Sequence, residues 1–178
     1  STDVQKVLNF QDAAAMDKAM FVKYVRGLDR KAGLTNTGAA LIKADKVFKK
    51  AMFRPDAKRI VIVATDGDPN RSRRCKENSY PDDPVLCAQY AAVDLKMQVK
   101  NEEEKDIQFI YLRIGQAAPE DLFKGIADGQ IDSTFASLGE KRDELMQMVA
   151  CPVGDATRPT SSAECEHGQV MVETDVLW

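Results

Sequence analysis

The stretch RIVIVATDG, residues 59–67, indicates the fold class of this chain of 178 residues. Its apolar, mostly β-branched run does not alternate with polar residues, which is typical of a strand buried on both faces of a parallel sheet. A polar turn that begins at Asp66 follows the strand. Open α/β sheets bind ligands at the carboxyl ends of their strands, so this turn is the first candidate for a site.

Further strands and helices are expected to alternate on both sides of this stretch. Strands are expected at 4–10, 106–115 and 133–138, and helices at 17–28, 38–52, 84–101, 119–127 and 140–149. This order predicts an α/β, doubly wound fold with a mostly parallel sheet and helices on both faces.

The composition excludes two classes of partner. The net charge is -3 and charged residues make up 30% of the chain, without a broadly basic segment, so nucleic acid is not an expected partner. No apolar run approaches the roughly 20 residues of a membrane-spanning helix, so no membrane span is expected in this segment.

Four cysteines form two local pairs. Cys75 and Cys87 bracket one polar, proline-containing loop, and Cys151 and Cys165 bracket another. We expect two disulfides and therefore an oxidising compartment, although four free thiols in a cytosolic domain are the alternative. Asn70 begins an Asn-Arg-Ser glycosylation motif in the first loop.

Two polar segments could bind a cation through oxygen atoms. Thr35-Asn36-Thr37 opens a helix, and Asp66-Gly67 ends the buried strand. Hydroxyl and carboxylate oxygens suit Mg²⁺, Ca²⁺ or Mn²⁺. Taken separately, the first segment is equally explained as a helix cap and the second as a tight turn.

Taken together, the T-x-T and T-D-G segments resemble the von Willebrand factor type A family, which includes the inserted domains of integrins. The resemblance covers roughly residues 1–151. It implies a metal-ion-dependent adhesion site in which Thr35 and Asp66 are metal ligands and an acidic residue of a protein partner completes the coordination. The neighbouring residues Asn36, Thr37, Gly67 and Asp68 would support the two loops.

One motif of that family is missing. The D-x-S-x-S ligand segment occurs nowhere in the chain. The resemblance implies that the first strand, first helix and second strand are absent, and that the rest of a longer chain or a partner chain supplies them; the tail entering the sheet is a further possibility. Metal binding by this chain alone is expected to be weak or absent. Residues 1–151 would form the domain, and residues 152–178 a disulfide-closed tail or linker to a further module.

These observations lead to one expected function and one alternative. The expected function is a secreted or extracellular protein–protein interaction module for adhesion or matrix assembly, with a remnant metal site. The alternative is a purely structural subunit of a larger assembly without a working metal site. No enzyme activity is expected, because the chain has no nucleophile–base pair and no Gly-rich phosphate loop, and because its only histidine, His167, is isolated.

Overall fold

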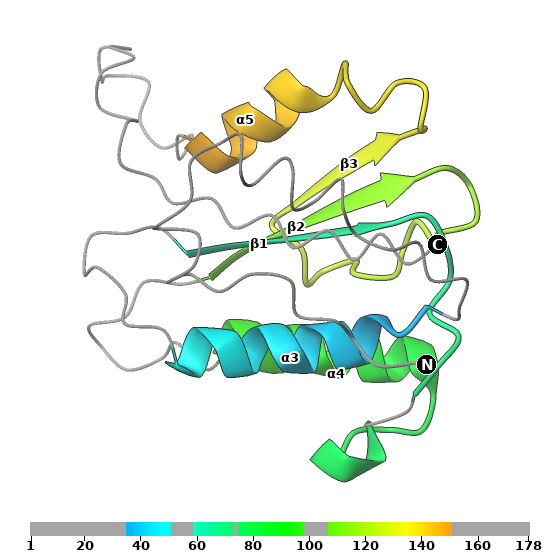
Figure 1. Cartoon of the computed structure of the whole chain (residues 1–178), viewed down its shortest axis with the longest axis vertical. Helices are drawn as coiled ribbons and strands as arrows, with labels where there is room; N and C mark the ends of the chain where they lie inside the picture. The colour runs from blue at the N-terminus through cyan, green and yellow to red at the C-terminus, as the bar shows by residue number, and fades with distance from the viewer. Residues whose placement is uncertain (1–34, 51–58, 73–74, 98–106, 151–178) are drawn as a thin grey trace, which may run out of the picture. The chain divides into compact units, whose positions relative to one another are not determined.

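A computed structural model describes residues 35–50, 59–72, 75–97 and 107–150 of the chain (Figure 1). These residues fall into two compact units. The first contains helix α3, the loop that follows Asp68, and most of helix α4. The second contains strands β1, β2 and β3 and helix α5.

The second unit is built on a parallel sheet with the strand order β1-β2-β3 (Figure 1). The strands span Arg59–Thr65 (β1), Ile107–Ile114 (β2) and Gly129–Ser133 (β3). Ile60, Val61 and Ile62 are at most 4% exposed, so β1 is buried on both faces as its unbroken apolar run predicts. The parallel sheet and its two apolar strands are confirmed.

Helix α5, Arg142–Ala150, covers one face of this sheet. Alternate residues of β1 and β2 point to that face, and Val149 of the helix packs among them. The apolar cluster consists of Ile60, Ile62, Ala64, Ile110, Leu112, Ile114, Ile131 and Val149. The helix expected at 140–149 is confirmed, with its first turn beginning two residues later.

Aromatic residues cover the other face of β2. The rings of Phe109 and Tyr111 each form a T-shaped pair with the ring of Phe123, at centroid distances of 5.0 and 5.2 Å. Edge-to-face pairs of this kind add to the stabilisation that comes from burying the rings. Phe123 lies in the connection between β2 and β3, so this connection is anchored to the sheet.

The first unit contains two long helices, α3 at Thr37–Lys50 and α4 at Pro84–Met97 (Figure 1). Leu41, Ala44 and Phe48 form the buried side of α3, as its apolar spacing predicts. The short helix η1, Lys76–Asn78, lies between α3 and α4 in the chain and has no buried residue.

Helix α4 buries mostly small residues. Its buried positions are Cys87, Ala88, Ala91, Ala92 and Leu95. Three large apolar residues of this helix are exposed: Leu86 at 44%, Tyr90 at 53% and Met97 at 56%. Gly38 of α3 packs directly against Cys87, and so close an approach of two helices requires small side chains.

The prediction of a helix at 119–127 is wrong. This segment consists of turns, in which the amides of Lys124 and Ile126 bond to carbonyls three residues earlier. The carbonyls of Ala118 and Pro119 accept bonds from the side chains of Arg113 and Tyr111, which tie the start of this segment to β2. Gly125, at a φ of 76°, ends the turns.

The strand expected at 133–138 is also misplaced, because β3 ends at Ser133. Thr134 and Ser137 form a turn in which each hydroxyl accepts the backbone N–H of the other residue, at 3.1 and 3.2 Å. Hydroxyl groups that bond to nearby amides in this way compete with strand pairing. The strand expected at 4–10 and the helix expected at 17–28 lie outside the described residues.

Candidate interaction site

The Thr35-Asn36-Thr37 loop begins helix α3 in the first unit. The Oδ1 atom of Asn36 accepts the N–H of Ala39 at 3.2 Å, and the carbonyl of Asn36 accepts the N–H of Ala40 at the same distance. Asn36 is therefore the N-cap of the helix. Asn36 and Thr37 are buried, at 3% and 4% exposure, whereas Thr35 is only partly buried.

The long loop that follows β1 is bonded to this helix start. The backbone N–H of Asn70 donates to the carbonyl of Thr35 at 3.0 Å, and Asn70 is exposed. Further along the loop, the expected disulfide joins Cys75 and Cys87, and both cysteines are completely buried. The second expected pair, Cys151 and Cys165, lies outside the described residues.

Polar contacts order the outer part of this loop. Asp82 accepts a hydrogen bond from Ser72 at 2.7 Å and pairs with Lys76, which lowers the pKa of the Asp82 carboxyl. The hydroxyl of Tyr80 donates to Asp94 of α4 at 2.6 Å. Burial, followed by this contact with the Asp94 carboxylate, raises the pKa of Tyr80. The described part of the loop thus carries charged groups on its exposed side.

In the second unit, Thr65 shapes the turn at the end of β1. Its buried hydroxyl donates to the carbonyl of Gly67 at 3.1 Å. The same hydroxyl oxygen accepts the N–H of Gly67, at an N···O distance of 3.3 Å. Asp66 and Gly67 are half-buried and Asp68 is exposed. These two bonds between Thr65 and Gly67 shape the bend at Asp66 and Gly67.

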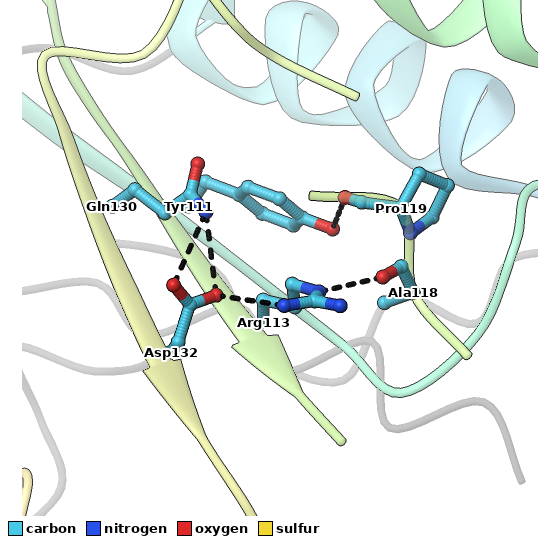
Figure 2. Close-up of polar contacts among 6 residues, drawn as sticks. All are labelled: Tyr111, Arg113, Ala118, Pro119, Gln130 and Asp132. Carbon is cyan, nitrogen blue, oxygen red and sulfur yellow. Dashed lines mark hydrogen bonds and ion pairs between the residues drawn. The ribbon is translucent and has the colours of Figure 1, made fainter. Parts of the chain in front are cut away.

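A second set of polar residues lies on the same sheet, and sequence reasoning missed it (Figure 2). Thr65, Arg113 and Asp132 occupy matching positions on β1, β2 and β3. The Nε of Arg113 donates to the carbonyl of Ala118 at 2.6 Å, and its guanidinium lies 3.4 Å from Asp132. Because these bonds hold Arg113 in place, the arrangement supports the β2–β3 connection rather than forming a free anion site.

Tyr111 belongs to this set and fixes the same connection. Its hydroxyl donates to the carbonyl of Pro119 at 2.9 Å (Figure 2). Burial of the ring raises the pKa of Tyr111 to about 12, although the nearby Arg113 acts in the opposite direction. The signal that sequence analysis lacked is the strand register, which brings Tyr111 and Arg113 beside β3.

The described residues do not form a complete metal site. Among them, no group of three or more His, Cys, Asp or Glu could hold a metal ion. Thr35 belongs to the first unit and Asp66 to the second. Together they would supply two oxygens of the roughly six ligands of Mg²⁺, so water or groups outside the described residues would have to complete the coordination.

Comparison with known families decides what kind of domain this is. The model of the von Willebrand factor type A domain matches residues 1–148. The chain belongs to the von Willebrand factor type A family. Neither a comparison with curated proteins nor one with solved structures found a match.

Membership of the type A family establishes the coarse properties of the chain. Its fold is α/β and doubly wound, in agreement with the parallel sheet and helices described above. Type A domains are generally protein-interaction modules and are typically not enzymes; they are commonly extracellular, which the Cys75–Cys87 disulfide fits. In the described part of the chain, no helix is both long enough and apolar enough to cross a membrane.

Proposed function

We propose that this type A domain is an extracellular module for adhesion or matrix assembly, and that it binds a protein partner through the loop at 70–87 and the adjoining Thr35 segment. The observation that carries the proposal is the completely buried Cys75–Cys87 disulfide, which closes a charged loop that Asn70 bonds to Thr35. Buried disulfides are typical of proteins that work in oxidising surroundings.

The chemistry of the loop favours a protein partner. Its exposed side chains include Lys76, Glu77, Asp82 and Asp83, so both signs of charge are presented on one surface. Such patterns give specificity and orientation to protein–protein encounters. Lys76 is the group best suited to meet an acidic residue of the partner, because its side chain is 72% exposed even while paired with Asp82.

The proposed role of metal is small. Thr35 and Asp66 are treated as a remnant of the adhesion site, because the described residues provide too few ligands for Mg²⁺, Ca²⁺ or Mn²⁺. Asn70 is proposed as a glycosylation site, residues 1–151 as the domain, and residues 152–178 as a tail closed by a Cys151–Cys165 disulfide. Peptide mapping of the secreted protein, without reduction and before and after glycan removal, tests these assignments.

The function is tested by matched charge reversals in the full chain, secreted and immobilised. Lys76→Glu alters the loop, and Lys124→Glu makes the same charge change at an exposed position of the second unit. Binding of solubilised extracellular-matrix proteins is quantified for each variant. We expect Lys76→Glu to weaken binding about fivefold, a loss of roughly 1 kcal/mol, and Lys124→Glu to leave it unchanged. Equal effects of the two variants, or no binding by the unaltered chain, would contradict the proposal.

A second candidate function is a purely structural subunit of a larger assembly without a working metal site. The incomplete donor set favours it. Under this alternative the chain binds no separate matrix ligand, and it sediments with its own assembly partners whether or not EDTA is present. Binding that is lost in EDTA would contradict both this alternative and the small role proposed for metal.

A further inference from the structure

The disulfide lies against the start of helix α3 as well as closing its own loop. Gly38 follows Thr37 in the first turn of the helix. A Cβ atom at this position would overlap the Sγ atom of Cys87 and would lie 3.3 Å from the backbone N of Ala88. The sulfur therefore occupies the space that a side chain would take at Gly38.

A backbone hydrogen bond also holds the start of helix α3. The N–H of Asn70 donates to the carbonyl of Thr35 at 3.0 Å. The chain continues from Asn70 to Ser72, whose carbonyl accepts the N–H of Cys75 at 2.9 Å. The disulfide then joins Cys75 to Cys87, which packs on Gly38. A closed path thus runs from Thr35 through the loop and the sulfurs back to the Thr35 segment.

We propose that the Cys75–Cys87 disulfide is a redox-sensitive lock on the Thr35–Gly38 segment. A dithiol reductant opens the lock by transferring two electrons and two protons: the bond between the two sulfurs breaks, both cysteines become thiols, and the reductant becomes a disulfide. The two thiols then separate, the Cys87 sulfur is no longer fixed beside Gly38, and the segment loosens. Because both cysteines are completely buried, the lock stays closed until the surrounding loop moves.

The proposed disulfide lock rests on the proposed binding function only because Thr35 adjoins the proposed binding surface. Its test measures the lock itself by amide hydrogen exchange in the full chain. The reporters are the N–H groups of Ala39, Ala40 and Asn70, which bond to Asn36 and Thr35. The N–H of Gly115, bonded to Ser133 at 2.7 Å in the second unit, is the internal reference.

Reduction by a dithiol, with thiol formation verified by alkylation and mass spectrometry, should speed exchange at the three reporters by roughly tenfold relative to Gly115. The variant Cys75→Ala with Cys87→Ala should give the same pattern without a reductant. Unchanged exchange at the reporters in protein shown to be reduced would overturn the proposal. A loss of matrix binding with an intact lock would instead count against the proposed function alone.

A coupling experiment separates the lock from a general stabilising role. In the oxidised protein, Gly38→Ala should speed exchange at the reporters because its Cβ meets the sulfur. In the cysteine-free variant the same substitution should have a smaller effect, because the sulfur is gone and only the backbone contacts at 3.3 Å remain. Gly139→Ala is the matched control, since a Cβ there meets nothing within 4 Å. Additive effects of the glycine and cysteine substitutions would overturn the lock.

Discussion

At the scale of single residues, the second unit depends on side chains that replace missing backbone partners. Asp128 is the clearest example. Its carboxylate accepts the N–H of Phe109 at 2.8 Å and the ammonium of Lys96 at 2.6 Å, while its own N–H donates to the carbonyl of Phe109. Lys96 also reaches the carbonyl of Ile126 at 2.7 Å. One acidic side chain thus joins α4, β2 and the turn before β3.

Replacing Asp128 by alanine should lower the free energy of unfolding by about 1–3 kcal/mol, because the N–H of Phe109 loses its acceptor. The ion pair with Lys96 adds little, since both side chains are partly exposed. Urea unfolding followed by circular dichroism measures the loss. Asp121→Ala, at an exposed position in the same connection, is the control. Equal stability of the two variants would show that the Phe109 bond is unimportant.

Tyr111 makes stability depend on pH in the alkaline range. Its pKa is about 12 in the folded protein, against 10.0 for a free tyrosine. The folded state therefore favours the neutral phenol, and the stability that this contributes is complete below pH 10.0 and is lost as pH rises towards 12. Unfolding measured across this range should show a steeper loss in the unaltered protein than in Tyr111→Phe. Parallel curves for the two proteins would contradict this assignment.

At the scale of elements, the capped start of α3 is a local structure that the sequence signals directly. Asn36→Ala should lower stability by about 1 kcal/mol, because the N–H of Ala39 loses its acceptor. Asn36→Ser should retain most of the stability that the cap contributes, since serine is also a good N-cap. Thermal unfolding of the two variants provides the measurement. A serine variant as unstable as the alanine variant would mean that the buried contacts of Asn36 matter more than the cap.

The elements predicted well are those whose pattern is long and strong. Strand β1 has an unbroken apolar run, β2 is apolar at all but two positions, and α3 has a clear apolar face. The segments around 119–127 and 133–138 were assigned wrongly because short patterns are decided by tertiary contacts, here Tyr111 with Pro119 and the Thr134–Ser137 turn. The same limit applies to the site: local motifs locate Thr35 and Asp66, but the pairing of Arg113 with Asp132 depends on strand register.

At the scale of the whole molecule, family membership and the chain's own donor set point in different directions. The type A model matches residues 1–148, yet the described residues provide no complete cation site. The shared fold therefore indicates an interaction module, while the ligands decide whether a metal takes part.

Millimolar Mg²⁺ should leave the melting temperature of this chain unchanged, because a cation that binds weakly adds no stability. A complete site would add about 2.7 kcal/mol at one hundred times its Kd. Differential scanning calorimetry with Mg²⁺ or with EDTA provides the measurement, and Asp66→Ala is compared under both conditions. A rise in melting temperature that disappears in Asp66→Ala would show that the chain completes the site with ligands outside the described residues.

The parallel pairing of β1 with β2 also affects how fast the molecule folds. Arg59 must find Ile107, with the whole disulfide loop and helix α4 between them. Closing so long a segment lowers the conformational entropy of the chain before any strand contact forms. Chains rich in such distant pairings therefore fold slowly. Because Cys75 and Cys87 are only 12 positions apart, their bond shortens the flexible length between the strands. The order of events therefore matters during synthesis: oxidation that precedes strand pairing shortens the conformational search and the time for which the apolar β1 remains exposed to other chains.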